Sequence, residues 1–256
     1  MFNFTGVSLQ LGGNPILKEM TGKIEPGAVT ALLGPNGSGK STLLSLLCGL
    51  TPPTKGEITL DRQSLSSFKA AVLAKKLALL PQRNPVPATL TVSDLVAFGR
   101  HPHRPWYQRV SKEDKEIIDW AMQETGITGY ASRLLTDLSG GELQRTWLAM
   151  VLTQNTDILM LDEPTSWLDI SHQLSLLKIV QRLNKQHNKT IVWVLHDLNQ
   201  ARQFSDNAIL INEGKIINQG DIHDVVNPKD ISTVYQTKVK MHSLGQQQIL
   251  WPEEQL

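Results

Sequence analysis

A glycine-rich segment near the N-terminus combines a lysine and hydroxyl groups in a spacing suited to binding phosphate. Lys40 adds positive charge and Ser41 a hydroxyl ligand for Mg²⁺. Glycines let the backbone turn so that its N–H groups converge on phosphate oxygens, with the dipole of a following helix behind them. A glycine-rich turn without a ligand is the alternative, and the flanking strand and helix patterns weaken it. The segment, which fits the pattern G-x-x-x-x-G-K-[ST], consists of Gly34, Pro35, Asn36, Gly37, Ser38, Gly39, Lys40, Ser41 and Thr42.

Two neighbouring carboxylates follow the apolar run 158–161. Strand pleating points Asp162 and Glu163 to opposite sides, so they should have different roles. Asp162 would hold Mg²⁺, and Glu163 would polarise the attacking water as a general base. Standing alone, this segment would be better explained as a strand that ends in a solvated acidic turn. The phosphate loop on the same chain favours the catalytic interpretation.

Phosphoryl transfer also needs a group that orients water and one that senses the γ-phosphate. Gln82 follows Leu79-Leu80-Pro81, and His196 follows the apolar run 191–195. Both residues occur where strands deliver side chains to the carboxyl edge of a parallel sheet, which is the edge where nucleotides bind. We therefore predict that both are catalytic and that Gln82 joins Ser41 and Asp162 as a Mg²⁺ ligand. Alone, either would be a hydrogen-bonding surface residue.

A second helix start has the composition of an anion site. Ser139, Gly140, Gly141 and Glu142 open a predicted helix, where a serine cap and close backbone approach favour a negative ligand. The chain thus has two such helix starts but one lysine-bearing loop. This suggests that groups from two protomers clamp each nucleotide, although Ser139 alone would be an ordinary N-cap.

The elements that must position these residues alternate along the chain. The run 29–33 predicts a strand before the phosphate loop, and 43–47 a helix after it. The runs 157–161 and 191–195 are continuously apolar, which is typical of strands covered on both faces. A mostly parallel, helix-flanked sheet of the α/β class follows.

Other segments depart from this alternation. Residues 84–152 lack β-branched runs, repeat apolar residues at helical spacing and predict a helical insertion. Residues 208–212 and 215–219 flank Glu213-Gly214 and predict a hairpin, whereas the stretch from Asp221 is expected to be helical and then to fray.

Composition limits the function classes. The 256 residues are 40% hydrophobic and 19% charged, with a net charge of +1, which fits one or two globular domains and disfavours a generic basic nucleic-acid binder. No apolar run approaches the roughly twenty residues of a membrane-spanning helix. The start of the chain lacks the features of a signal peptide, so we expect the chain to stay in the cytoplasm. Cys48, the single cysteine, cannot form an internal disulfide.

Together these motifs resemble the ATP-binding cassette (ABC) family, and their order and spacing agree along nearly the whole chain. The resemblance implies a P-loop NTPase (RecA-like) core with an antiparallel β portion, as one cassette over 1–256 with a helical subdomain inserted at about 84–152. It also implies a head-to-tail homodimer enclosing two ATP molecules with Mg²⁺. In that dimer Ser139 and Gly141 would complete the partner's site, Asp169 would contact the partner's phosphate loop, and Gln82 would couple the site to a membrane permease. The matching residues are the phosphate loop, Gln82, 138–145, 162–165, 166–169 and His196.

Two positions depart from the common family pattern. Many members carry Gln at the position of Glu142, a variation to which we assign little functional weight. Leu11 stands where an aromatic residue usually stacks on adenine. Leucine has no π-face, so we expect modest discrimination between ATP and GTP.

Segments 92–103 and 168–173 are similar to the subfamily that energises uptake of ferric siderophores, haem and cobalamin. This similarity implies a peripheral ATPase on the cytoplasmic face of the membrane, serving permease subunits and, indirectly, an extracytoplasmic substrate-binding protein. Ferric siderophore is the first expectation, and haem or cobalamin the alternative. A soluble ABC ATPase acting on nucleic acid or ribosomes is the competing class. A small-molecule kinase would leave Gln82 and 138–145 unexplained.

Several other residues have competing explanations. His101 and His103 could suggest a metal site, but no third ligand is nearby in sequence, so a loop that faces the permease is preferred. His172 is expected to have a surface or capping role. Five tryptophans are expected to be core or interface anchors, namely Trp106, Trp120, Trp147, Trp167 and Trp193.

Overall fold

The computed structural model describes residues 1–104, 108–245 and 247–253. The chain divides into two compact units. The first contains Met1–Ser67 and Val192–Leu256, and the second contains Phe68–Ile191. Trp106, one of the tryptophans considered above, lies outside the described residues. Within the described residues, none of the helices has both the length and the apolar character needed to span a bilayer.

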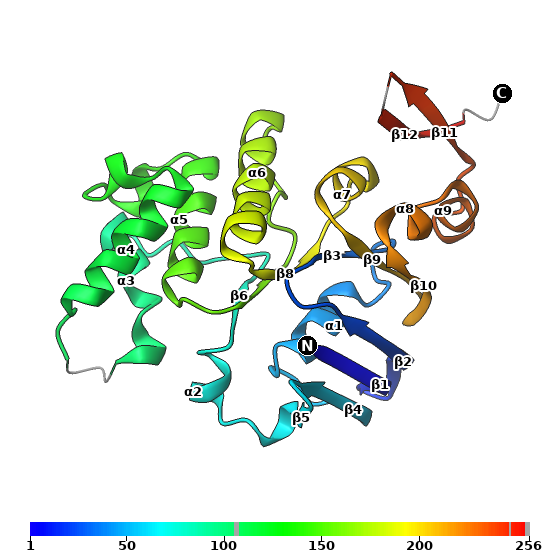
Figure 1. Cartoon of the computed structure of the whole chain (residues 1–256), viewed down its shortest axis with the longest axis horizontal. Coiled ribbons are helices and arrows are strands. Elements are labelled where there is room, and N and C mark those ends of the chain that lie inside the picture. The colour runs from blue at the N-terminus through cyan, green and yellow to red at the C-terminus, as the bar shows by residue number, and fades with distance from the viewer. Residues whose placement is uncertain (105–107, 246, 254–256) are drawn as a thin grey trace. The chain divides into compact units, whose positions relative to one another are not determined.

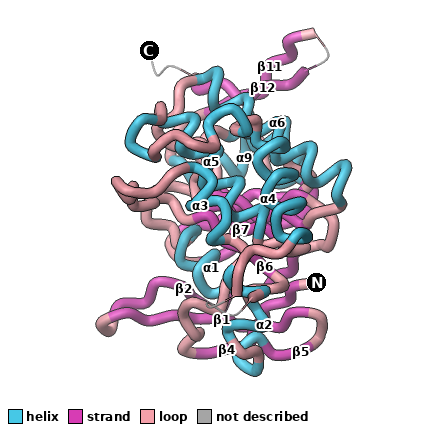
Figure 2. Tube along the Cα trace, turned by 90° about the vertical axis from the view of Figure 1, so that its left-hand side faces the viewer, coloured by secondary structure: helices cyan, strands magenta, loops and turns pink. Residues whose placement is uncertain are grey.

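An antiparallel sheet begins the first unit (Figures 1 and 2). Its strand order is β2-β1-β4-β5, and in β1 the side chains of Phe2, Phe4, Val7 and Leu9 are buried. This alternation puts one face of the strand against a core. The sheet accounts for the antiparallel β portion that the family resemblance implies. Its strands are β1 (Phe2–Leu11), β2 (Asn14–Ile24), β4 (Lys55–Leu60) and β5 (Gln63–Ser64).

The phosphate loop follows a strand of a second sheet in the first unit. β3 (Val29–Leu33) pairs in parallel with β9 (Asn207–Asn212), and β9 pairs antiparallel with β10 (Lys215–Asp221). The predicted strand before the loop and the predicted hairpin around Glu213-Gly214 are both confirmed. All five residues of β3 are buried, as expected of a strand covered on both faces. The helices α1 (Lys40–Leu47) and α7 (Leu198–Phe204) belong to the same unit.

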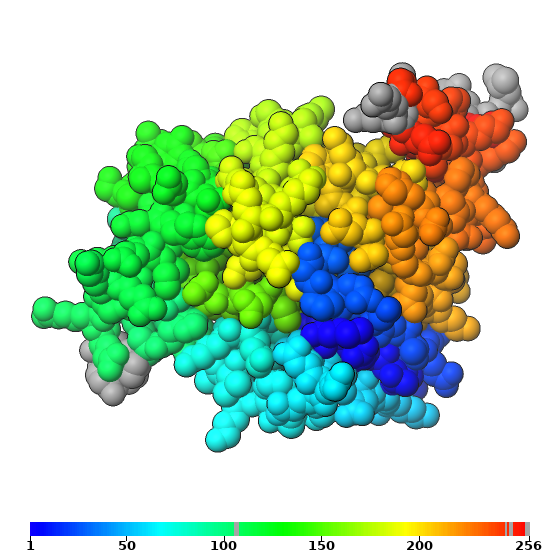
Figure 3. All heavy atoms as spheres, viewed as in Figure 1, coloured from blue at the N-terminus to red at the C-terminus, as the bar shows by residue number. Residues whose placement is uncertain are grey.

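The C-terminal part differs from the expectation. Helices α8 (Ile222–Val225) and α9 (Pro228–Tyr235) form as predicted, but the chain does not fray after them. It forms a hairpin of β11 (Val239–Leu244) and β12 (Gln247–Pro252), drawn in red in Figures 1 and 3. The Asn199 side chain donates to Leu250 O (3.2 Å) and accepts from Leu250 N (2.8 Å). The hairpin is not evident from local sequence, because part of its support comes from a residue 51 positions away.

The second unit combines two parallel strands with most of the helices. β6 (Leu77–Leu80) pairs with β7 (Ile158–Leu161), whose four residues are all buried. β8 (Thr190–Val194) contains the boundary between the units. The helices are α2 (Ala70–Leu73), α3 (Val92–Phe98), α4 (Lys112–Thr125), α5 (Gly140–Thr153) and α6 (Ile170–His187). Short 3₁₀ turns occur at Leu65–Ser67 in the first unit and at His101–His103, Thr128–Tyr130 and Leu135–Asp137 in the second.

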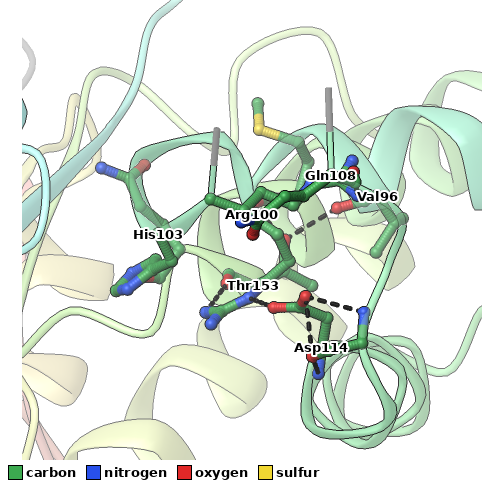
Figure 4. Close-up of polar contacts among 10 residues, drawn as sticks. Val96, Arg100, His103, Gln108, Asp114 and Thr153 are labelled. Carbon is green, nitrogen blue, oxygen red and sulfur yellow. Dashed lines mark hydrogen bonds and ion pairs between the residues drawn. The ribbon is translucent and has the colours of Figure 1, made fainter. Parts of the chain in front are cut away.

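A buried cluster around the ion pair of Arg100 with Asp114 connects α3, α4 and α5 (Figure 4). Arg100 Nε donates to Asp114 Oδ1 (2.7 Å), and Arg100 Nη1 donates to Thr153 O (2.8 Å). Thr153 Oγ1 in turn donates to Val96 O (2.7 Å). Burial alone would raise the pKa of the Asp114 carboxyl, but hydrogen bonds from Arg100 and Ser111 outweigh it and hold that pKa below its ordinary value. The cluster therefore ties the three helices together through charged groups.

The tryptophans have different environments. Trp193 is fully buried and Trp147 nearly so, which confirms them as core residues. Trp120 lies edge-on to His187, with ring centroids 5.2 Å apart. Trp167 is 86% exposed and is therefore not part of the core.

Candidate nucleotide site

The phosphate loop has a backbone that only glycine accommodates easily. Gly34, Gly37 and Gly39 have φ values of 143°, 77° and 107°, in the region that side chains disfavour. A Cβ on Gly34 would lie 2.0 Å from Ile211 O, and one on Gly39 would lie 2.6 Å from Leu17 Cδ2. A Cβ on Gly37 would meet nothing within 4 Å. A neighbouring backbone carbonyl therefore requires glycine at position 34, and the backbone angles favour glycine at positions 37 and 39.

Lys40 lies inside the curve of this loop. Its Nζ donates to Gly34 O (2.8 Å) and Pro35 O (2.9 Å), and the residue is only 5% exposed. Lys40 is also the first residue of α1, whose N-cap Gly39 offers no side-chain acceptor to the N–H groups of the first turn. These N–H groups and the ammonium group form a positive environment suited to phosphate. Ser41 and Thr42 follow in the same turn.

Two supports of the loop were not predicted. Gly34 N donates to the Tyr235 hydroxyl (3.1 Å), and Gly214 N donates to Ser38 O (3.0 Å). Burial raises the pKa of Tyr235, although the Gly34 bond acts in the opposite direction, so its hydroxyl stays neutral. Tyr235 is 201 residues from Gly34, and no local pattern could have indicated the contact.

The second unit brings Gln82 and Glu163 together. Asp162 N donates to Leu80 O (2.9 Å), which continues the pairing of β6 with β7 beyond the strand ends. Gln82 Nε2 then donates to Glu163 Oε2 (2.5 Å), and Ser166 Oγ donates to the same oxygen (3.0 Å). Glu163 has φ 49°, a left-handed conformation that is unfavourable for a non-glycine residue and is often found at functional sites.

The start of α5 is a capping box. Ser139 Oγ accepts from Glu142 N (3.3 Å), and Glu142 Oε2 accepts from Ser139 N (2.8 Å). The hydrogen bond from Ser139 N contributes most to holding the pKa of Glu142 below its ordinary value. Glu142, to which the sequence analysis gave little weight, therefore fixes the helix start. The spacing S-x-x-E could have indicated this box.

Asp169 caps the start of α6 in a similar way. Its Oδ1 accepts from His172 N (2.9 Å), His172 Nδ1 (2.8 Å) and Ser171 Oγ (2.9 Å). These bonds lower the pKa of Asp169 to about 2, and the bond from His172 N contributes most. The carboxyl is therefore ionised at neutral pH. Asp169 is thus the N-cap of α6, and His172, for which we expect a surface or capping role, donates to this cap.

The connection between Glu163 and Asp169 is held from two helices. Gln144 Nε2 on α5 donates to Pro164 O (3.0 Å). Gln173 Nε2 on α6 donates to Thr165 O (3.3 Å) and Leu168 O (2.9 Å). Side-chain amides therefore fix the backbone of this segment at three carbonyls.

The predicted site residues divide between the two units. The first unit holds the phosphate loop and His196, an exposed residue between β8 and α7. The second unit holds Gln82, Asp162, Glu163, Asp169 and residues 139–142. Each unit thus presents its own part of the chemistry predicted from the sequence.

His101 and His103 have structural contacts. The ring of His101 lies 5.2 Å from that of Phe98, and His103 Nε2 lies 2.7 Å from Gln154 O. Among the described residues, no group of three or more His, Cys, Asp or Glu side chains could hold a metal ion. Both histidines therefore take part in contacts within the second unit.

Comparison with known proteins shows the family of this chain. The family model described as "ABC transporter" matches residues 17–166. The chain belongs to the ABC transporter family. The match starts in β2, takes in the phosphate loop, Gln82 and the start of α5, and ends just beyond Glu163.

Relatives of this ABC protein have names that refer to petrobactin import and ferric enterobactin transport. The chain is 49% identical over 210 residues to the petrobactin import ATP-binding protein FpuC of Bacillus anthracis, covering 82% of this chain and 77% of the relative. It is 44% identical over 229 residues to the ferric enterobactin transport ATP-binding protein FepC of Escherichia coli, covering 90% and 84%. Among solved structures, a dimeric bacterial ABC transporter cassette matches with a TM-score of 0.76 at 26% identity, covering 87% of this chain and 99% of that one. The expected ABC cassette fold is confirmed.

Proposed function

We propose that this ABC protein is the ATP-hydrolysing subunit of an importer for ferric siderophores. The names of FpuC and FepC, at 49% and 44% identity, support both the ATPase role and the iron-complex cargo. The arrangement around Glu163 carries the catalytic part of the proposal, because its carboxylate is held by groups that can also organise a water molecule.

Glu163 is the proposed general base. Gln82 and Ser166 both donate to Oε2, so the direction of the carboxylate is fixed by two hydrogen bonds. The Glu163 carboxylate is assigned the proton of the attacking water, while the water oxygen forms a bond to the γ-phosphorus and the bond to ADP breaks. Lys40 and the first turn of α1 neutralise phosphate charge, and His196 is proposed to contact the γ-phosphate.

The residues present fit a Mg²⁺ ion. Ser41, Asp162 and Gln82 offer a hydroxyl, a carboxylate and an amide oxygen, and oxygen donors are what this cation prefers. Gln82 uses its Nε2 on Glu163, which leaves Oε1 as the ligand atom. When bound, Mg²⁺ would supply positive charge that offsets the charge of the phosphates. Gln82 would then link the metal to the general base.

The proposed active form is a head-to-tail homodimer. The dimeric cassette structure at 26% identity supports this assembly. Ser139, Gly140, Gly141 and Glu142 would complete the partner's ATP site, and Asp169 would meet the partner's phosphate loop. Trp167 and Ile170, which flank Asp169 in sequence, are 86% and 76% exposed and would be covered in such a dimer.

The whole chain is proposed to act as one cassette, with residues 84–152 as its inserted helical subdomain. It would bind permease subunits at the cytoplasmic face of the membrane, with Gln82 coupling the ATP site to them. An extracytoplasmic substrate-binding protein would deliver the cargo, and no nucleic acid would take part.

Substitution of the general base tests the enzymatic part. Glu163→Gln should retain ATP binding while turnover falls by about 10²- to 10⁴-fold, because the amide cannot accept the proton. ATP affinity is measured by calorimetry and turnover by phosphate release. Glu113→Gln, the same change on exposed α4, is the control. Wild-type turnover in Glu163→Gln would overturn the assignment of the base.

Isolation of the membrane complex tests the cargo. The chain would be purified with its permease and receptor, and the receptor's ligand identified by mass spectrometry. Identification of a ferric siderophore would support the proposal. Identification of haem or cobalamin would show that this compound is the cargo instead. A chain that stays out of the membrane fraction when the permease is present would favour a soluble ABC ATPase.

A further inference from the structure

Two features of the second unit meet at one side chain, that of His172. The first is the start of α5, at Ser139, Gly140 and Gly141. The second is Asp169 at the start of α6. In the proposed dimer, both features contact the partner cassette. The residue that lies between them has no role in that proposal.

The His172 ring packs directly against Gly141. A Cβ added to this glycine would lie 2.2 Å from His172 Cδ2, 2.5 Å from Cγ and 2.8 Å from Nε2. No real side chain tolerates such distances, so the ring occupies the space that the missing side chain leaves. Gly141 is buried as a result, and the backbone of α5 approaches α6 at this point.

The other edge of the same ring is bonded to Asp169. His172 Nδ1 lies 2.8 Å from Asp169 Oδ1, and the backbone N–H of His172 donates to the same oxygen (2.9 Å). Asp169 is ionised at neutral pH and can only accept. We therefore assign the N–H to Nδ1, which donates a hydrogen bond to the carboxylate. One imidazole thus contacts the backbone of one helix start and the capping carboxylate of the other.

We propose that His172 is a positioning residue that holds Asp169 and the 139–142 helix start in a fixed relation, so that both reach the partner's ATP site together. This inference rests on the proposed function. The phosphate loop belongs to the first unit and His172 to the second, so we expect binding of ATP to a single chain not to depend on this residue. Turnover should depend on it, because turnover requires the partner's groups.

The test compares three substitutions in the full chain. His172→Ala removes both contacts. His172→Asn retains a short N–H donor toward Asp169 but has no ring against Gly141. His172→Phe retains a ring against Gly141 but has no donor. His187→Ala, at the other end of α6, is the matched control.

His172→Ala should lower kcat by about tenfold. The dissociation constant of a single chain for ATP should change less than about twofold, measured on the catalytically inactive Glu163→Gln background at protein concentrations where analytical ultracentrifugation shows only monomer. The Asn and Phe variants should stay close to the Ala variant in kcat, because each restores only one of the two contacts. Thermal melting would show all variants folded, and His187→Ala should match the wild type.

Each other result overturns the inference. Full recovery by His172→Asn would mean that only the cap on Asp169 matters, and full recovery by His172→Phe would mean that only packing matters. A parallel loss of ATP affinity and melting temperature in His172→Ala would indicate a general structural role. Wild-type protein without ATPase activity would refute the proposed function, whereas an active wild type with an equally active His172→Ala would refute this inference alone.

Discussion

The buried ion pair between Arg100 and Asp114 gives a stability prediction that the structure makes quantitative. We expect Arg100→Met to destabilise the second unit, because it leaves the Asp114 carboxylate buried without its cation. The two residues are 5% and 6% exposed, so water can hardly replace the lost partner. The Thr153 carbonyl loses its bond from Arg100 in the same step.

The magnitude follows from these contacts. A hydrogen bond to a charged group contributes about 1.5–3 kcal/mol, and two are lost. Removing one member of a buried ion pair costs about 3–5 kcal/mol, which agrees with that sum. This is a large share of the roughly 5–15 kcal/mol that stabilises a typical domain. Replacing both residues by Arg100→Met with Asp114→Leu should recover a large part of the loss, since no unpaired charge remains.

Urea unfolding followed by circular dichroism measures the effect. Because the chain has two compact units, the loss should appear in the transition of the unit that contains the pair. Lys23→Met is the control. It breaks the exposed pair of Lys23 with Glu25, whose side chains are 60% and 41% exposed, and should change stability by about 0–1 kcal/mol. If Arg100→Met lost no more than this control, the reasoning about burial would be wrong.

The pH dependence of the same variants has a definite sign. The pKa of Asp114 is lower in the folded chain than its ordinary value of 3.8. The carboxylate therefore contributes stability that is fully present above about pH 4 and is lost as the pH falls through the folded pKa. The gap between wild type and Arg100→Met should be constant from about pH 6 to 8 and should narrow in acid. A gap that widened in acid would contradict the lowered pKa.

Three further predictions concern the ATP site and the proposed dimer. Trp167→Ala should weaken ATP-dependent dimerisation of Glu163→Gln by roughly 30-fold in analytical ultracentrifugation, because an aromatic anchor at an interface typically contributes about 2 kcal/mol. Unchanged dimerisation would exclude Trp167 from the interface. Because Leu11 is 53% exposed and lacks a π-face, the kcat/KM values for ATP and GTP should differ by less than about tenfold. A strong preference for ATP would show that residues other than Leu11 recognise the base. Gly34→Ala should lower ATP affinity by about 10- to 100-fold in calorimetry, since its Cβ would lie 2.0 Å from Ile211 O. An affinity equal to that of the wild type would mean that the loop can move aside.

Much of the local chemistry could be predicted from the sequence. The phosphate loop is contiguous, and its function depends on glycine φ angles and a lysine that lie within a few residues of one another. The strands before it and before Asp162 are continuous apolar runs, and the hairpin at Glu213-Gly214 has a local turn signal. In each case the determining interactions are short in sequence, so residue type and spacing carry the information.

The tertiary structure decided which of these residues act on one another. Gln82 donates to Glu163 across 81 residues, and Gly34 donates to Tyr235 across 201. The sequence predicts only that His172 lies at the start of a helix. The approach of α6 to α5 brings its ring against Gly141. The C-terminal hairpin likewise depends in part on Asn199, 51 residues before Leu250. The sequence by itself therefore determined the chemical groups and the elements that carry them, because these are set by local backbone preference and apolar periodicity. Their pairing was decided by the tertiary structure alone, because it depends on distant segments meeting in space.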